Sequence, residues 1–248
     1  MIVTIIGEIC FDIFVYGEVK RMCPEAPVPI LTNLSLDTNM GMAGNVRRNI
    51  LSYNPSYETR LINQKQTIRK TRYVDEKTNH MFLRVDEGDD DVDKLVLTPE
   101  KVEEIIESDI VIVSDYNKGF LDEKTIVKIG KMSKFSVIDT KKTISEDIIE
   151  SFDFIKLNEH EYQRNKVIAD NYKEKFIITL GMKGAKHNET IYDSPSPKQT
   201  IDVSGAGDTF TAFFSLKYHE TKNIEESILF ANEMASIVVS KRGVTTPF

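Results

Sequence analysis

Five short apolar runs recur along the chain, and signals for helix starts lie between them. The runs cover residues 2–7, 109–114, 135–138, 153–157 and 176–180. Thr98, followed by Pro99 and an early acid, has the residues that open helices, and Asp122 is a second helix start. Strands that alternate with helices along a chain predict an α/β fold with a mostly parallel sheet.

Acidic, amide or glycine residues follow several of these apolar runs. Asp12 comes shortly after the first run and Asp115 directly after the second, while Asn158 and Gly181 follow the last two. Residues just past the carboxyl ends of parallel strands face the ligand crevice of such a sheet, so we expect these residues along one edge. Asp12 is then a candidate for binding sugar hydroxyls, and the alternative is an ordinary turn acid.

The stretch Gly205-Ala206-Gly207-Asp208 puts three small residues directly before an acid. Residues 198–203 can form a short strand, and aromatic residues recur at helical spacing afterwards, so we expect a strand-to-helix turn. Free amides at a helix start can hold the oxygens of a phosphate, and Asp208 can accept the proton of an attacking hydroxyl. The alternative is an N-cap aspartate after a flexible turn. The pattern is neither a P-loop nor a dinucleotide fingerprint.

A second group of small residues, at 41–44, also precedes a helical pattern. Backbone without side chains can approach a ligand closely there, and Asn45 can offer both a donor and an acceptor to a polyol. The alternative role of Asn45 is that of a helix cap.

Residues 67–74 and 80–86 are strand-like runs joined by a polar turn, which predicts a hairpin. A hairpin that interrupts the strand–helix alternation is usually an added flap. Lys70, Arg72 and Arg84 lie on it and are candidates to bind a phosphorylated substrate, the alternative being solvated surface charge.

Composition narrows the class of protein. At 248 residues, 40% of them hydrophobic, the chain is long enough for one main domain. A net charge of -7 argues against a general nucleic-acid or membrane binder. Cys10 and Cys23 are too few for a disulfide framework, the four histidines have no metal-ligand spacing, and no apolar run reaches membrane-spanning length. We expect a cytosolic protein.

Several motifs occur in one order over nearly the whole chain. They are Arg21 with Pro24-Glu25-Ala26-Pro27-Val28-Pro29, the residues from Gly41 to Asn49, Ser114-Asp115-Tyr116 with Lys118-Gly119, Asn158 with Glu161, the residues from Asp202 to Thr209, and Phe230-Ala231-Asn232. On these residues the chain resembles the ribokinase-like (PfkB) carbohydrate kinase family. It is most similar to the heptose-7-phosphate kinase branch, which forms one domain of bifunctional heptose kinase/adenylyltransferases.

The resemblance implies a three-layer α/β/α ribokinase-like sandwich with a mostly parallel sheet and a small β lid. Residues 1–248 would form a single kinase domain, with lid segments at about 13–35 and 67–87. The activity implied is ATP-dependent phosphorylation of a sugar hydroxyl, in this branch O1 of D-glycero-β-D-manno-heptose 7-phosphate. The alternatives are a kinase for another sugar, sugar phosphate or nucleoside, and a non-catalytic sugar- or nucleotide-binding relative.

The resemblance also assigns residues. Asp208 would be the base, with Gly205, Ala206 and Gly207 as the anion hole. Substrate contacts would come from Asp12, Gly44, Asn45, Asp115, Lys118, Arg72 and Arg84. The nucleotide would meet Asn158, Glu161, Thr179, Gly181, Gly184 and Asn232, with Glu161 holding Mg²⁺ through water. Asp202 and Ser204 match positions that hold a monovalent cation such as K⁺.

The sequence departs from the family pattern at several places. Met42 replaces the second glycine of the usual sugar-binding pair, and the segments after residue 62 and from 162 to 175 are shortened. Missing layers would expose sheet edge, so we expect a homodimer that covers it through the lid.

Overall fold

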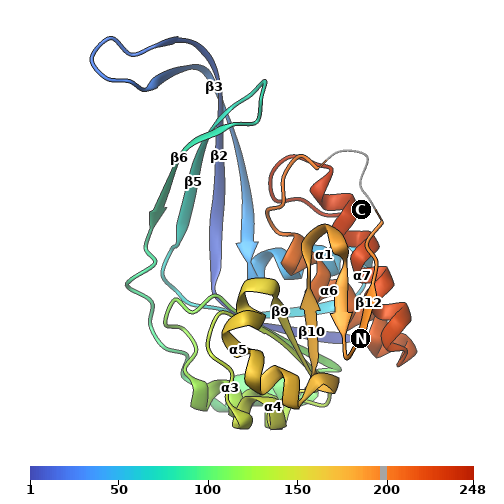
Figure 1. Cartoon of the computed structure of the whole chain (residues 1–248). Helices are drawn as coiled ribbons and strands as arrows, with labels where there is room; N and C mark the ends of the chain where they lie inside the picture. Colours follow the sequence, from blue (N-terminus) through green and yellow to red (C-terminus); the bar gives the residue numbers. More distant parts are fainter. Residues whose placement is uncertain (196–199) are drawn as a thin grey trace.

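The computed structural model describes residues 1–195 and 200–248. Figure 1 shows a body built on one sheet with helices against it, and a long, narrow sheet that rises from the body. The predicted α/β fold with a mostly parallel sheet is confirmed.

The main sheet has eight strands in the order β12-β11-β10-β9-β8-β7-β1-β4. All neighbours from β10 to β4 are parallel, and β11 and β12 add an antiparallel hairpin at one edge. The strands are β1 (Ile2–Gly7), β4 (Glu58–Ile62), β7 (Ile110–Asp115), β8 (Ser136–Thr140), β9 (Phe154–Asn158), β10 (Phe176–Thr179), β11 (Ala185–His187) and β12 (Thr190–Tyr192).

Helices cover both faces of this sheet and make three layers. Side chains alternate between the faces, so Ile5 packs in the cluster that contains α1, α6 and α7, while Ile6 packs in the cluster that contains α2 to α5. The helices are α1 (Ala43–Tyr53), α2 (Pro99–Glu107), α3 (Glu123–Met132), α4 (Glu146–Ser151), α5 (Glu159–Asn171), α6 (Ala206–Thr221) and α7 (Ile224–Val239), with short 3₁₀ turns η1 (Lys173–Lys175) and η2 (Gly181–Lys183). Within the described ranges, no helix combines the length and the apolarity needed to cross a bilayer.

The second sheet, called the lid here, has the strand order β3-β2-β5-β6. Its strands are β2 (Ile9–Met22), β3 (Pro29–Met42), β5 (Arg69–Asp75) and β6 (Met81–Glu87). The proline-rich residues 24–28 form the loop between β2 and the edge strand β3. The sheet includes the lid segments that the sequence predicts, but its first hairpin is longer and reaches back to the body at both ends (Figure 1).

The register of the lid gives its two faces different chemistry. One face carries the row Asp12–Lys70–Asp86 across β2, β5 and β6, followed by the row Phe14–Arg72–Arg84. Phe14 packs on this face with Val74 and Val244, so the face is directed toward the body. The opposite face carries Leu36, Val15, Tyr73 and Leu83 in one row across all four strands. Side chains alternate along a strand, so this apolar row and the two charged rows lie on opposite faces, although the row Phe11–Arg69–Glu87 puts charge on the apolar face as well.

The prediction of a strand at 198–203 is wrong for residues 200–203. Lys198 and Gln199 lie outside the described residues, and residues 200–203 form no strand. The amides of Ile201 and Asp202 donate instead to the carbonyl of Val239, at 2.8 and 3.2 Å, which ties the segment to the end of α7. The small-residue turn is therefore a loop-to-helix turn, and the partners that hold it come from the C-terminal helix.

Candidate active site

Asp208 lies in the first turn of α6 and is 3% exposed. Its Oδ1 accepts a hydrogen bond of 2.7 Å from the hydroxyl of Tyr116, and its Oδ2 accepts one of 3.1 Å from Nδ2 of Asn45. These two donors come from the loop after β7 and from α1. Residues far apart in the sequence therefore hold one carboxylate in a single orientation.

Burial raises the pKa of Asp208 to about 6, and the hydrogen bonds from Tyr116 and Asn45 limit the rise. Burial and the nearby Asp208 carboxylate raise the pKa of Tyr116, so its phenol keeps its proton and remains a donor. A carboxyl group that ionises near neutral pH suits the removal of a proton from an alcohol. The site thus contains a candidate general base.

The turn before Asp208 leaves backbone amides open. Gly205 has φ 78°, and a Cβ there would lie 2.6 Å from Nδ2 of Asn45, so glycine is required on two grounds. In the described part of the chain the amides of Gly205 and Gly207 have no hydrogen-bond acceptor, and that of Ala206 makes one bond of 3.3 Å to Val203. Open amides at a helix start favour an anion.

Two cavities meet at this turn. The larger, of about 700 Å³, is lined by Ala206 and Gly207. The smaller, of about 310 Å³, is lined by Gly205 and Asp208, and Tyr116 lines both. Among the residues expected at a nucleotide, those that line the larger cavity are Asn158, Thr179, Gly181, Gly184 and Asn232. Among those expected at a substrate, the smaller cavity is lined by Asp12, Arg72, Arg84 and Lys118.

Three residues expected to contact a substrate do not line the smaller cavity. Asp115 is fully buried and forms an ion pair with Lys142 at 2.9 Å. Gly44 packs in α1 against Met40, where a Cβ would lie 2.9 Å away. Asn45 is fully buried, and its amide holds Asp208 and the carbonyl of Gly205. The side-chain polar groups of Asp115 and Asn45 therefore already have protein partners, and Gly44 packs against apolar side chains.

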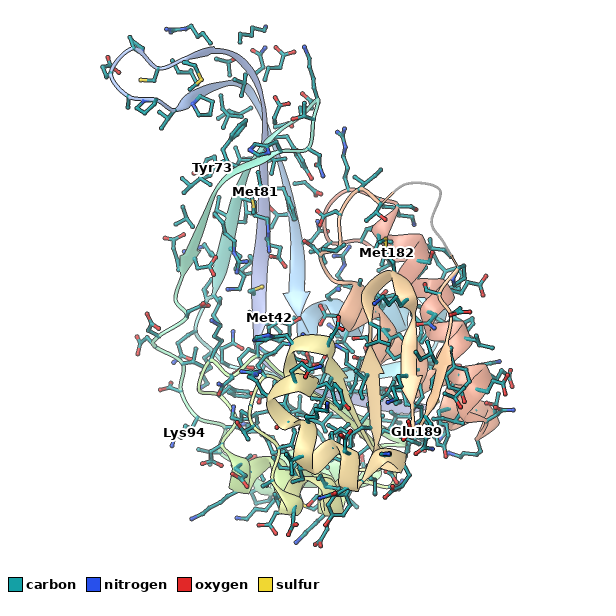
Figure 2. The ribbon with its side chains drawn as sticks, viewed as in Figure 1. Met42, Tyr73, Met81, Lys94, Met182 and Glu189 are labelled. Carbon is teal, nitrogen blue, oxygen red and sulfur yellow. The ribbon has the colours of Figure 1, made fainter. Side chains whose placement is uncertain are left out.

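Met42 lines the smaller cavity with a backbone conformation that non-glycine residues rarely adopt. Its dihedral angles are φ 58° and ψ −134°, and it immediately precedes α1. Figure 2 shows it at the base of the lid, where β3 meets the body. Its side chain is buried beside Cys10 and Ile68. Met42 thus has a backbone conformation that glycine adopts more readily, and its side chain forms part of the cavity wall.

A buried ion pair on the larger cavity was missed from the sequence. Nζ of Lys156, on β9, contacts Oδ2 of Asp139 at 2.8 Å, and both side chains line the cavity. The same ammonium lies 3.0 Å from the position that a Cβ on Gly207 would take. Burial works against ionisation of Asp139, but Lys156 and Lys141 outweigh it and hold its pKa below the usual value. The signal available in the sequence was a lysine inside an otherwise apolar strand.

The arrangement of Asn158 and Glu161 is a helix capping box. Oδ1 of Asn158 accepts from the amide of Glu161, and Oε2 of Glu161 accepts from the amide of Asn158, both at 2.8 Å. Oε1 of Glu161 forms an ion pair with Lys141 at 2.6 Å. Glu161 is buried and does not line the larger cavity, so the expected role in holding Mg²⁺ does not fit this arrangement. Throughout residues 1–195 and 200–248, no three His, Cys, Asp or Glu side chains converge on a metal site.

Asp202 organises the loop that leads into the turn. Its Oδ1 accepts from the amide of Ser204 at 2.8 Å, and its Oδ2 accepts from the amide of Gly243 at 3.2 Å. A carboxylate oxygen has further lone pairs, so these contacts leave acceptor capacity at a position where a monovalent cation was expected.

Comparison with known proteins gives concordant matches. Residues 57–248 match the family described as pfkB family carbohydrate kinase. The protein named Bifunctional protein HldE from Helicobacter pylori strain J99 is 30% identical over 295 residues, covering 97% of this chain and 63% of that protein. The protein of the same name from Bradyrhizobium diazoefficiens is 27% identical, covering 97% of this chain and 60% of that protein. The chain therefore spans less than two thirds of the length of these relatives.

Solved structures share the fold at low sequence identity. Arabidopsis thaliana ribokinase, complexed with ribose and ATP, has a TM-score of 0.73 and 17% identity, with 97% of this chain and 93% of that chain covered. Phosphofructokinase-2 from Escherichia coli, in complex with potassium, has a TM-score of 0.69 and 15% identity, with 99% and 94% covered. The three-layer ribokinase-like fold is thus shown.

Proposed function

We propose, since the chain belongs to the pfkB family of carbohydrate kinases, that it transfers the γ-phosphoryl group of ATP to O1 of D-glycero-β-D-manno-heptose 7-phosphate. The family makes the protein a phosphotransferase with an alcohol acceptor. The choice of heptose is supported by the HldE relatives, which match almost the whole chain. The choice of ATP is supported by the ribokinase of similar fold that is complexed with it.

One observation carries the proposal. The turn Gly205-Ala206-Gly207-Asp208 contributes Ala206 and Gly207 to the larger cavity and Gly205 and Asp208 to the smaller one. A donor in the first cavity and an acceptor in the second would therefore meet at the open amides of this turn. Phosphoryl transfer depends mainly on such positioning and on stabilisation of charge.

The proposed reaction assigns each group a step. Asp208 accepts the proton of the acceptor hydroxyl as that oxygen bonds to the γ-phosphorus. The bond from this phosphorus to the bridging oxygen of ADP breaks, and the amides of Gly205 and Gly207 stabilise the charge on the phosphoryl oxygens. Asp208 later releases its proton to solvent. Tyr116 and Asn45 hold the carboxylate in place during these steps.

On the donor side, Thr179, Gly181, Gly184 and Asn232 would contact the nucleotide, since they line the larger cavity. Mg²⁺ would neutralise charge on the phosphate oxygens. Because Glu161 is already paired with Lys141, we propose that the metal enters with the nucleotide and keeps several waters, as Mg²⁺ commonly does. A monovalent cation beside Asp202 and Ser204 remains part of the proposal, supported by the potassium complex of a protein with this fold.

On the acceptor side, Asp12 would bind sugar hydroxyls, and Arg72, Arg84 and Lys118 would bind the phosphate that the sugar already carries. Arginine and lysine side chains form strong charge-assisted hydrogen bonds to phosphate oxygens. An unphosphorylated sugar would make no such bonds.

We further propose that residues 1–248 act as one kinase domain that pairs with a second copy through the lid. The apolar row on the lid's outer face contains Leu36 and Leu83, which are 72% and 55% exposed. Figure 2 shows Tyr73 and Met81 on this part of the lid, well above the body. Exposed apolar rows of this kind on a sheet often mark an interface.

Met42 supports a second candidate, a kinase for a different acceptor. Because its side chain fills part of the smaller cavity, the space for a sugar differs from that of relatives with glycine there. The third possibility is a non-catalytic sugar- or nucleotide-binding protein. Asp208, with its pKa of about 6, argues against it because a binding protein has no need for a base.

The proposal is tested by measuring the release of ADP from ATP in the presence of Mg²⁺. A panel of sugar phosphates, free sugars and nucleosides serves as acceptors. We expect the highest kcat/KM with the heptose 7-phosphate, and turnover that is lower by several orders of magnitude with Asp208→Asn. Faster turnover of another acceptor would replace the heptose assignment. Binding of ligands without turnover of any acceptor would identify a binding protein.

A further inference from the structure

Four cations line the smaller cavity, and carboxylates already contact each of them. Arg72 contacts Asp12 at 2.5 Å, and Arg84 contacts Asp86 at 2.7 Å. Lys70 contacts Asp86 at 3.1 Å, and the remaining contacts of Lys70 and Lys118 are made with Asp89. The positive charge of the cavity is therefore largely balanced within the protein.

This balance conflicts with the binding of a phosphate. A phosphomonoester has a charge of about −1.5 to −2 at neutral pH. It gains little from ammonium groups that keep their carboxylate partners, and it is repelled by those carboxylates. Binding of such a group is therefore strengthened if one carboxylate moves away.

Asp89 is the carboxylate best placed to move. Asp12 and Asp86 lie within strands of the lid, whose backbone hydrogen bonds fix them. Asp89 follows β6 in a segment without helix or strand. Displacement of Asp89 therefore breaks no sheet hydrogen bond.

Asp89 also joins two lysines from separate parts of the chain. Its Oδ2 lies 2.5 Å from Nζ of Lys118, in the loop after β7, and 3.3 Å from Nζ of Lys70, on β5. Its Oδ1 lies 3.3 Å from the same Lys70 nitrogen. The carboxylate thus makes the contacts that two oxygens of a phosphate would make with this pair of lysines.

We propose that Asp89 is an internal competitor for the phosphate of the substrate. Its carboxylate bridges Lys70 and Lys118 in the free protein, and the phosphomonoester of the acceptor displaces it and takes over both lysines. Lys70 thereby becomes a phosphate contact, and Asp89 sets the affinity for phosphorylated acceptors. The inference rests on the proposed function only in taking the acceptor to be a sugar phosphate.

Calorimetric titration of the whole chain with inorganic phosphate, without nucleotide, tests this directly. We expect Asp89→Asn to bind phosphate about fivefold more tightly than the unmodified protein. A partly exposed ion pair contributes a free energy of about this size, and in the variant it no longer competes with phosphate. Asp91→Asn is the matched control, because Asp91 is an exposed acid two residues along the same segment. It should bind phosphate as the unmodified protein does.

Two further variants complete the test. Asp89→Ala should also bind phosphate more tightly, and Lys118→Met in the Asp89→Asn background should abolish the gain. Unchanged melting temperatures establish that the variants are folded. Phosphate binding by Asp89→Asn and Asp89→Ala that is no tighter than in the unmodified protein would overturn the inference and leave Asp89 as a structural partner of the lysines.

Kinetics separate this inference from the proposed function. With a sugar phosphate that is turned over, Asp89→Asn should lower KM and leave kcat nearly unchanged. Absence of turnover with every sugar phosphate would count against the proposed function, whereas the phosphate titrations would still decide the role of Asp89.

Discussion

The hydroxyl of Tyr116 donates a 2.7 Å hydrogen bond to Oδ1 of Asp208, across 92 residues of sequence. The bond joins the loop after β7 to the first turn of α6 at the boundary between the two cavities. It stabilises the ionised carboxylate and so lowers the pKa of Asp208 from the value that burial alone would give.

Tyr116→Phe should therefore make the reaction more sensitive to acid. Asp208 acts as a base only when ionised, so kcat/KM falls as the pH drops through its pKa. Without the Tyr116 hydrogen bond this pKa rises, and the fall moves to higher pH. We expect roughly tenfold lower activity at pH 6 and about twofold lower activity at pH 8.

The matched control is Tyr162→Phe, which removes a similar hydrogen bond of 2.6 Å to Asp170, away from both cavities. Its pH–rate profile should coincide with that of the unmodified enzyme. An unchanged profile for Tyr116→Phe would show that the hydroxyl does not tune the base.

Asp208→Asn should lower kcat by several orders of magnitude with little effect on the Kd of ATP. A general base contributes about 10²–10⁴ in rate, and the loss of correct positioning adds to this. Asparagine retains the shape of the side chain, so the variant should still bind nucleotide, as measured by calorimetry. A rate near that of the unmodified enzyme would exclude Asp208 from the mechanism.

At position 42 the glycine variant should be more stable than the alanine variant, which is the reverse of the usual order. Met42→Gly and Met42→Ala both remove the buried side chain, but only glycine adopts φ 58°, ψ −134° without strain. The glycine variant should exceed the alanine variant in free energy of unfolding by about 1–2 kcal/mol, measured by urea denaturation. Greater stability of the alanine variant would mean that the backbone relaxes out of this conformation.

Lys156→Met should destabilise the fold because it leaves Asp139 buried with less compensation. Loss of one partner of a buried ion pair costs about 3–5 kcal/mol, and we expect about 3 kcal/mol because Lys141 remains 3.3 Å from Asp139. The double variant Lys156→Met with Asp139→Asn should recover part of the loss in urea denaturation. No recovery would assign the cost to packing.

Leu83→Glu should convert the proposed dimer into a monomer, since it places a charge in the apolar row of the lid. The control is Val167→Glu, because Val167 is 82% exposed on α5 and far from the lid in sequence. Sedimentation velocity distinguishes the two states. A monomeric unmodified protein, or a dimer that survives Leu83→Glu, would refute the interface.

The layers of the fold could be predicted from local patterns, because each apolar run and each helix start depends on residues close in sequence. The turn at Gly205 and the helix after it were predictable for the same reason. The segment before the turn was not. Val203 suggests a strand, yet its side chain is 70% exposed, and the neighbouring amides bond to Val239 on a different element.

The arrangement of the site depends on contacts that no periodicity encodes. Asn45 was expected at the substrate, but in the structure it donates to Asp208 from 163 residues away. Asp89 is one of three consecutive aspartates, and its contact with Lys118 depends on how the lid meets the body. The sequence therefore supplied the chemical groups, whereas their pairing required the tertiary structure.

The lid and the body each contribute about half of the residues that line the smaller cavity, while the larger one belongs to the body. Substitutions on β5 or β6 can therefore change which alcohol is admitted without disturbing the layers that would hold the donor. Selection can thus change the acceptor cavity of such an enzyme while the donor cavity stays the same. A lineage built on this architecture has a short mutational route from one acceptor to the next.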